Sequence, residues 1–115
     1  MHEVCIVSLL LMEKAALLKK IKETVHSVEP GATVILYGSY ARGEEHEDSD
    51  IDLLILVEKD ILNYKEGKRI TYPLFSLGYS EGVLISPALY SKKVWETKYR
   101  ITPFYENIVR EGVFL

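Results

Sequence analysis

Two short groups of residues, together spanning residues 38–52, carry the residue types that chemistry on phosphates needs. The first is Gly38-Ser39, with Arg42 three positions further on. An apolar, β-branched run precedes Gly38, so we expect the chain to turn there from a strand into a helix, whose first backbone N–H groups are free to bind an anion. Gly38 lets a phosphate approach the backbone, the Ser39 hydroxyl can donate a hydrogen bond, and Arg42 can add a charged one. The pattern predicts a phosphate-binding turn.

The second group is Asp50 and Asp52, separated by one residue at the start of another apolar run. Alternate side chains of a strand point to one face, so both carboxylates are expected side by side. Aspartate is disfavoured in strands, and two adjacent like charges repel unless a cation lies between them. A divalent metal is the natural partner. A phosphate-binding turn beside a carboxylate pair predicts a site for a Mg²⁺-bound nucleoside triphosphate.

Each part alone has an ordinary structural explanation. Gly-Ser after a strand is most often a turn and helix cap, and Ser-Asp-x-Asp before an apolar run is most often a turn with solvated carboxylates. Arg42 alone would be a surface residue. All three features within residues 38–52, in this order and bridging two predicted strands, favour a functional origin.

The elements that must position these residues follow from the spacing of apolar side chains. Residues 9–28 have the period of a helix, which Glu29-Pro30-Gly31 ends. Thr33–Tyr37 and Ile51–Val57 are predicted strands. From Leu53 to Val57 both faces of the second strand are apolar, as expected for a central strand covered on two sides.

The second half of the chain continues the alternation of helices and strands. We expect a helix near residues 70–79 that Pro73 disturbs, then a strand over residues 83–90, where Pro87 favours an edge position or a bulge. Ser91 caps a helix reaching about Arg100, and a last short helix lies between Pro103 and Gly112. Four aromatic residues are predicted to pack these last helices onto the sheet: Trp95, Tyr99, Phe104 and Tyr105. The order predicts one α/β (α+β) domain over residues 1–115, with a small mixed sheet flanked by helices.

Composition excludes several classes of protein. With 115 residues, 48% of them hydrophobic, the chain can build one core, and its net charge of −3 argues against a protein that coats nucleic acid. Nucleic acid is therefore expected only as the acceptor of a transferred group, not as a molecule that the protein coats. The single cysteine, Cys5, excludes an internal disulfide and fits a cytoplasmic setting. The apolar run Val4–Met12 is too short to span a bilayer, so we expect it to begin the folded domain and predict no membrane association.

The order Gly38-Ser39-x-x-Arg42-Gly43 and Ser49-Asp50-x-Asp52-Leu53 resembles the signature of the minimal nucleotidyltransferases of the DNA polymerase β-like superfamily. The element order matches as well, so the resemblance covers most of the chain. It implies the polymerase β-like fold, a site for Mg²⁺ with ATP or a related nucleotide, and transfer of a nucleoside monophosphate to a hydroxyl. The family pattern allows two metal ions. In this chain it assigns the triphosphate to Gly38 and Ser39, and the metal and catalysis to Asp50 and Asp52. Arg42 and Ser49 of the same motif are predicted to bind the nucleotide as well.

One departure from the family concerns a third carboxylate, which a later strand usually supplies to activate the acceptor. The matching position here, near Leu84, is apolar, and Glu81 just outside that strand is the only nearby substitute. Glu81 is more simply explained as a solvated loop residue. The missing acid bears on catalysis and leaves the predicted fold unchanged.

Two functions therefore remain open. The chain is either a nucleotidyltransferase, which transfers AMP from Mg–ATP, or a catalytically weak, antitoxin-like nucleotide-binding module. The resemblance implies a small helical partner of the HEPN type for such stand-alone domains, and a homodimer is the alternative assembly. The acceptor is open among a small molecule, an RNA end and a protein hydroxyl.

Overall fold

The computed structural model describes residues 2–115, with side chains described from Ser8 onward. Four strands form one mixed sheet in the order β3-β2-β1-β4. β1 (Thr33–Tyr37) lies antiparallel to β2 (Ile51–Val57) and to β4 (Val113–Phe114), while β2 lies parallel to β3 (Ile85–Ser91). The predicted mixed sheet is confirmed, with β4 as a strand that the sequence analysis missed.

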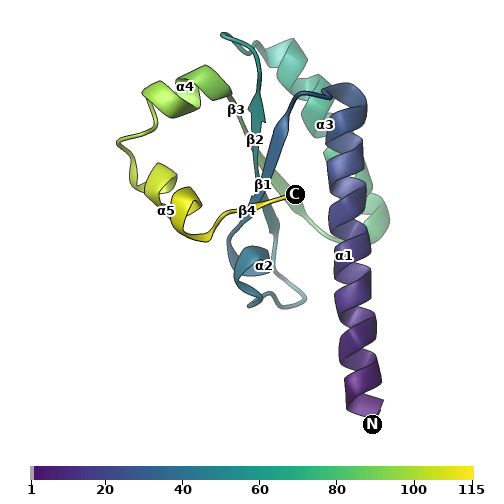
Figure 1. Cartoon of the computed structure of the whole chain (residues 1–115). Helices are drawn as coiled ribbons and strands as arrows, with labels where there is room; N and C mark the ends of the chain where they lie inside the picture. Colours follow the sequence, from purple (N-terminus) through teal and green to yellow (C-terminus); the bar gives the residue numbers. More distant parts are fainter. Residues whose placement is uncertain (1) are drawn as a thin grey trace.

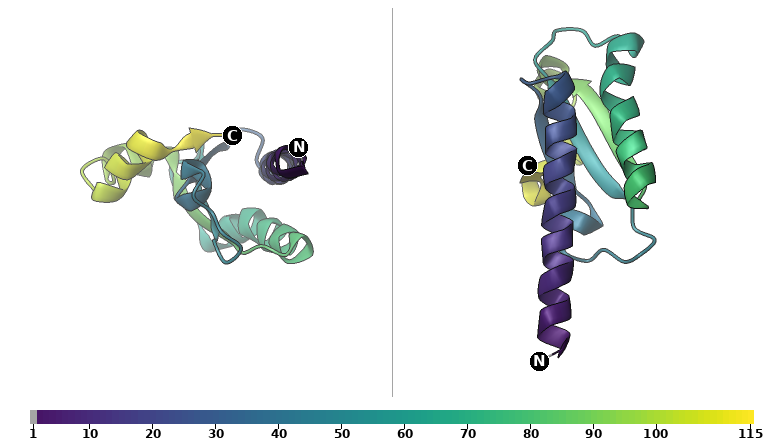
Figure 2. Two further views of the ribbon diagram at one scale, coloured as in Figure 1. Left: turned by 90° about the horizontal axis from the view of Figure 1, so that it is seen from below. Right: turned by 90° about the vertical axis from the view of Figure 1, so that its right-hand side faces the viewer.

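Helices cover both faces of this sheet. The long helix α1 (His2–Val28) and α3 (Tyr64–Glu81) lie on one side, and the shorter α4 (Lys92–Thr97) and α5 (Pro103–Glu111) lie on the other (Figures 1 and 2). A single turn, α2 (Ser39–Arg42), follows β1 at the end of the sheet. The helices that flank the sheet agree with the predicted fold class.

The central strand β2 explains how this core is built. Its residues Ile51, Leu53, Ile55 and Val57 are fully buried in the cluster that faces α1 and α3. Leu54 and Leu56 belong to the other cluster, under α4 and α5. Because side chains alternate along a strand, Asp52 starts the row of Leu54 and Leu56 and lies on the α4–α5 face. The buried run of β2 thus places this carboxylate at one end of an otherwise apolar face.

Aromatic side chains join α4 and α5 to this face, as predicted. Trp95 is 4% exposed and lies 5.3 Å from Phe104 and 5.2 Å from Tyr105, measured between ring centroids. Tyr99 stacks on Trp95 at 5.9 Å. Tyr37 of β1 makes an edge contact with Phe104 at 5.4 Å. The rings therefore connect α5 to the strand that leads into α2.

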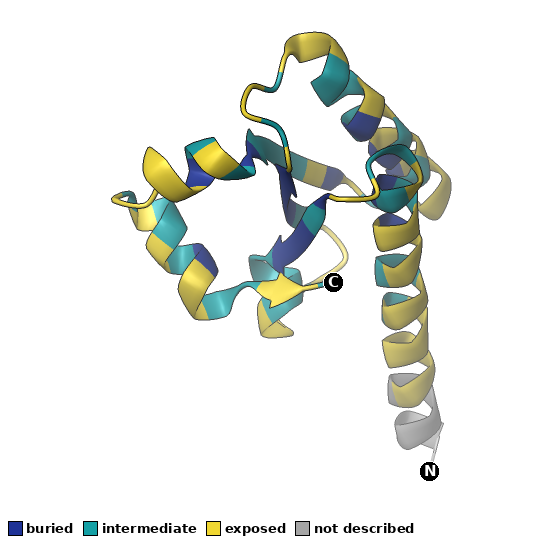
Figure 3. Ribbon diagram, turned by 45° about the horizontal axis from the view of Figure 1, so that its top comes forward, coloured by how far each residue is buried: buried dark blue, intermediate teal, exposed yellow. Residues whose placement is uncertain are grey.

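The structure corrects the predicted first helix. The helix begins at His2, and its apolar stripe is buried only in its second half, where Ile21 and Val25 are fully covered. Leu9, Leu10, Leu11 and Met12 are 56–68% exposed, because the helix extends past the end of the sheet (Figure 3). Cys5 lies outside the described side chains. No helix within residues 2–115 is long and apolar enough to cross a membrane.

Other differences are smaller. α3 begins at Tyr64, because Asn63 caps it by accepting a hydrogen bond from the backbone N–H of Glu66 at 2.8 Å. The helix continues through Pro73. β3 begins at Ile85 rather than residue 83, and its Pro87 lies in an edge strand, as expected. α4 ends at Thr97 rather than near Arg100.

Candidate functional site

The predicted phosphate-binding turn and the predicted carboxylate pair meet at Gly38. Tyr37 pairs with Asp52 across β1 and β2, so the residue after Tyr37 lies beside the Asp52 side chain. Gly38 has φ 75° and ψ −156°, a backbone conformation open to glycine. A Cβ atom on Gly38 would lie 2.4 Å from Oδ2 of Asp52. Because Gly38 has no side chain, the Asp52 carboxylate can lie directly against the turn.

The helix after Gly38 is shorter than a typical anion-binding helix. α2 is one turn long and ends at Gly43 in the left-handed conformation. A single turn sums few peptide dipoles, so its macrodipole is weak. The anion binding predicted for this turn would therefore depend on individual donors, among them the backbone N–H of Gly38 and the guanidinium of Arg42.

Asp52 is the more constrained carboxylate of the pair. Burial raises its pKa above the ordinary value, and the negative charge of Asp50 raises it further, while Arg42 opposes the shift. The negative charge of Asp50 thus acts on Asp52, and the side-by-side arrangement of the two carboxylates stays a prediction. A bound cation would relieve both causes of the shift.

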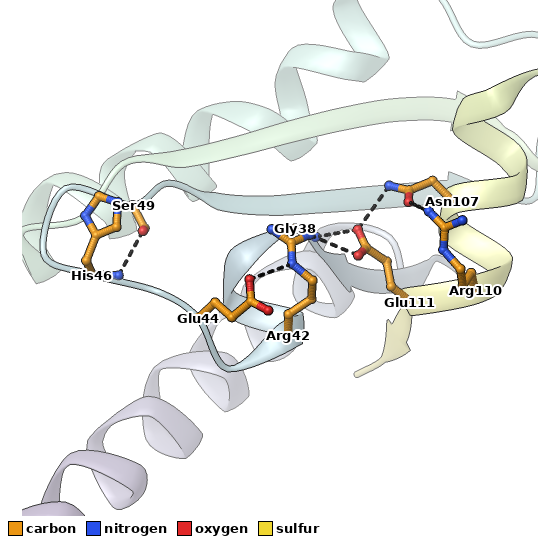
Figure 4. A network of polar contacts seen from close by, with 8 residues as sticks. All are labelled: Gly38, Arg42, Glu44, His46, Ser49, Asn107, Arg110 and Glu111. Carbon is orange, nitrogen blue, oxygen red and sulfur yellow. Dashed lines mark hydrogen bonds and ion pairs between the residues drawn. The ribbon is translucent and has the colours of Figure 1, made fainter.

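Asp50 and Ser49 lie at the end of the loop that leads into β2. Asp50 is exposed and directly precedes the strand. Ser49 closes a turn, because its Oγ accepts a hydrogen bond from the backbone N–H of His46 at 2.9 Å and its own N–H donates to the carbonyl of His46 at 2.9 Å (Figure 4). In this structure the Ser49 hydroxyl stabilises the turn that precedes Asp50. Its contact with nucleotide stays a prediction.

Arg42 points toward the C-terminal segment, where it meets a residue that sequence reasoning missed. Its Nη1 donates to Oε2 of Glu111 at 2.9 Å, and its Nε donates to Oε2 of Glu44 at 3.2 Å (Figure 4). The backbone N–H of Gly38 donates to Oε1 of Glu111 at 3.2 Å. The pKa of the Glu111 carboxyl lies below its ordinary value, first because of the Arg42 hydrogen bond. Glu111 therefore accepts hydrogen bonds from two donors of the predicted phosphate site, the Gly38 N–H and the Arg42 guanidinium.

Comparison with known proteins agrees with this geometry. Residues 18–109 match the model of the nucleotidyltransferase domain family. The chain belongs to this family. Two relatives from Methanocaldococcus jannaschii, both named as candidate protein adenylyltransferases, are 36% and 32% identical to it. The alignments cover 89% and 82% of this chain, and 98% and 92% of those proteins.

Two solved structures share the fold. One is a toxin–antitoxin complex crystallised with AMP-PNP, with a TM-score of 0.58 and 20% identity. The other is the toxin–antitoxin pair MntA–HpeT with two aspartates changed to glutamate, with a TM-score of 0.60 and 18% identity. Each alignment covers 84% of this chain and 69% of that chain.

As a nucleotidyltransferase domain, the chain lacks a third carboxylate on β3. Ser86 is the residue that pairs with Asp52, and Leu84, before the strand, is 62% exposed. Glu81 forms an ion pair with Nζ of Lys20 at 2.6 Å, which joins α3 to α1 on the opposite side of the sheet. Its charge is not among those that shift the pKa of Asp52. The residue of β3 level with Asp52 is therefore Ser86 rather than Leu84, and it carries no carboxylate either.

The residues of the site fit Mg²⁺ in one specific way. Within the described residues, no group of three or more His, Cys, Asp or Glu side chains is arranged to hold a metal ion. Mg²⁺ on substrate phosphates commonly uses only one or two protein carboxylates and completes its shell with phosphate oxygens and water. Asp50 and Asp52 supply such a pair, so the donor set suits a metal that arrives with a nucleotide.

Proposed function

We propose that this nucleotidyltransferase domain transfers AMP from Mg–ATP to a hydroxyl group of a protein acceptor. The observation that carries the proposal is the contact geometry of Gly38 and Asp52, because it joins a phosphate-binding turn to a metal-binding carboxylate. The names of the two relatives support adenylyl transfer to protein, and the AMP-PNP in one structural neighbour supports an adenine nucleotide.

In this proposal each predicted site residue has a separate task. Gly38, Ser39 and Arg42 bind the triphosphate, and Asp50 and Asp52 hold Mg²⁺. Ser49 fixes the loop that presents Asp50 and lies at the edge of the nucleotide. Bound Mg²⁺ would neutralise charge on the phosphates, and a second ion would extend this to the acceptor oxygen.

The reaction forms a bond between the acceptor oxygen and the α-phosphorus and breaks the bond from that phosphorus to the bridging oxygen. Pyrophosphate leaves with the electron pair of the broken bond, and the acceptor hydroxyl loses its proton. Neither Ser86 nor Leu84 can take that proton as a carboxylate would. The proton therefore passes to water or to a base that the acceptor protein brings, which makes positioning of the acceptor a large part of catalysis.

Calorimetry tests nucleotide binding and the role of each aspartate. We expect ATP to bind with Mg²⁺ present and to lose affinity in EDTA, and Asp50→Asn and Asp52→Asn to abolish the metal-dependent part. Asp48→Asn is the matched control, because Asp48 is an exposed acid of the same loop. Equal heats with Mg²⁺ and with EDTA, or parental binding by both Asp50→Asn and Asp52→Asn, would contradict the proposed site.

Labelled ATP tests the transfer itself. With ATP labelled at the α-phosphate, a protein acceptor in cell extract should gain label that resists removal of free nucleotide, and γ-labelled ATP should leave it unlabelled. Label transferred from the γ-position would show phosphoryl transfer and refute the proposed reaction.

A second candidate is a weakly active, antitoxin-like module that acts through a bound partner. Two observations favour it: the absence of a carboxylate at Ser86 and the exposed apolar residues of α1. A groove of about 910 Å³ runs from Leu10 and Leu11 of α1 to Tyr40 and the loop residues 45–47. The two toxin–antitoxin neighbours support a protein partner, for which the family resemblance implies a small helical protein of the HEPN type, and a homodimer is the alternative.

Light scattering and co-purification separate these assemblies. We expect a dimer or a complex with a small helical protein, and little transfer by the free domain. A monomer that adenylylates a small molecule unaided would contradict the requirement for a partner.

A further inference from the structure

Glu111 reaches the phosphate site because of the register between β4 and β1. Val113 pairs with Leu36 and Phe114 with Ile35 in antiparallel orientation. Continuing this register by two residues sets Glu111 level with Gly38. Gly112 allows the close approach, since a Cβ there would lie 2.8 Å from Cγ2 of Ile35. The sheet edge therefore fixes the end of α5 beside the turn.

The Glu111 carboxylate makes contacts that suit an anion of a nucleotide. Oε1 accepts from the backbone N–H of Gly38 at 3.2 Å, and Oε2 accepts from Nη1 of Arg42 at 2.9 Å. Nδ2 of Asn107 donates to Oε1 at 3.0 Å, and Asn107 is itself held by Arg110 at 2.7 Å (Figure 4). The Glu111 side chain is 13% exposed. A carboxylate thus already occupies two of the donors assigned to phosphate.

The place of Glu111 is otherwise unfavourable for a negative charge. It is the last residue of α5, where the partial charge of the helix end is negative. Its charge also raises the pKa of Asp52, so the two carboxylates repel each other. Donation from Gly38, Arg42 and Asn107 offsets these costs. When a triphosphate takes the donors of Gly38 and Arg42, Glu111 loses most of what stabilises it there.

We infer that Glu111 is an internal competitor for nucleotide phosphate, which occupies the Gly38 N–H and the Arg42 guanidinium in the free protein and must leave when the triphosphate binds. The inference rests on the proposed function, because it takes these two groups as the triphosphate site. Glu111 thereby sets the nucleotide affinity of the site. The ligand class is a polyphosphate, recognised by one backbone donor and one guanidinium.

The opposite role would be positioning, in which Glu111 holds Arg42 ready for the phosphate. The two roles predict opposite signs. Removing a competitor raises affinity for polyphosphate, whereas removing a positioning residue lowers it. Glu111→Gln keeps the shape and one acceptor oxygen, so it separates the charge from the packing. Glu106→Gln is the matched control, because Glu106 lies on α5, is exposed, and changes the net charge by the same amount.

The experiment titrates the parent chain and both variants with tripolyphosphate without metal, and separately with Mg–ATP. Glu111→Gln should bind tripolyphosphate about tenfold more tightly than the parent, the size expected when one charge-assisted contact no longer competes, and Glu106→Gln should bind like the parent. Amide hydrogen exchange at Leu115, whose N–H donates to the carbonyl of Val34 at 2.9 Å, should quicken when tripolyphosphate displaces Glu111 in the parent.

The outcomes separate this inference from the proposed function. Tighter tripolyphosphate binding by Glu111→Gln, with no Mg–ATP binding by any chain, would support competition for polyphosphate and refute the proposed AMP transfer from Mg–ATP. Equal or weaker tripolyphosphate binding by Glu111→Gln would overturn the competitor, whatever Mg–ATP does. Failure of all three chains to bind tripolyphosphate would overturn it as well. An equal gain in Glu106→Gln would reduce the effect to net charge and also overturn it.

Discussion

Replacing Gly38 with alanine tests the contact between the turn and the metal-binding carboxylate. The new Cβ would lie 2.4 Å from Oδ2 and 3.3 Å from Cγ of Asp52. The φ of 75° and ψ of −156° at this position also disfavour any side chain. Gly38→Ala should therefore strain the backbone and push the Asp52 carboxylate away at the same time.

The two costs can be given separate magnitudes. A non-glycine residue in this conformation costs about 1–3 kcal/mol. Moving the Asp52 side chain from its rotamer adds about 1 kcal/mol. The expected loss of stability is about 2–4 kcal/mol, and for a domain of 115 residues each kcal/mol lowers Tm by about 4 °C. Mg–ATP binding should be lost along with it, because the displaced carboxylate no longer faces the turn.

Thermal unfolding followed by circular dichroism measures this loss. Gly43→Ala is the matched control, since Gly43 has φ 70° and a Cβ there meets nothing within 4 Å. It should cost only the left-handed backbone conformation, about 1–2 kcal/mol. In an Asp52→Ala background, the cost of Gly38→Ala should fall by about 1 kcal/mol, because the clashing atoms are gone. Equal costs in the two backgrounds, or a Gly38→Ala variant as stable as Gly43→Ala, would refute the reasoning.

Three further outcomes follow from the same structure. Asp52→Asn should raise the Tm of the metal-free protein, and by more at neutral than at acidic pH. The pKa of Asp52 is raised in the folded protein, so ionisation of this carboxyl lowers the free energy of unfolding as pH rises through that pKa. Thermal unfolding of parent and variant at several pH values would measure the difference. Gly78→Ala should destabilise the domain by about 1–3 kcal/mol in denaturant unfolding, because its Cβ would lie 2.6 Å from the carbonyl oxygen of Val83. Glu81→Gln should cost less than about 1 kcal/mol and leave Mg–ATP binding unchanged in calorimetry, since Glu81 pairs with Lys20 at the surface. Lost nucleotide binding would revive it as the third carboxylate.

The part of the fold that sequence predicted well is the part with a strong local signal. β1 and β2 begin and end where predicted, because a run of β-branched and aliphatic residues between polar turns has one good solution. The contact of Gly38 with Asp52 follows from these two strands, since Gly38 comes directly after β1 and Asp52 is the second residue of β2, paired with Tyr37. The family match over residues 18–109 confirms the resemblance read from this motif.

Glu111 could not be found in this way. Its place depends on β4, a strand of two exposed residues that shows no hydrophobic alternation. The register that sets it beside Gly38 is a tertiary property, fixed by how α5 packs its rings on Tyr37 and Trp95. Glu111 followed by Gly112 reads only as a helix end. The start of α1 at His2 was missed for a similar reason: periodicity indicates an apolar stripe but not how far the helix extends past the sheet.

The loop of residues 44–49, which holds the acids Glu44, Glu45, Glu47 and Asp48, contacts α1 and leads to Asp50. Lys14 of α1 donates to the carbonyl of Tyr40 at 2.9 Å and forms an ion pair with Glu45. This one side chain therefore joins α1 to α2 and to the loop that follows it. A partner lying along Leu10 and Leu11 would border the same groove as Glu45 and His46. Its own side chains would then come close to the loop that carries Asp50. A domain with serine in place of a third carboxylate gains most from such a partner, because the partner could bring the acceptor hydroxyl and the base together.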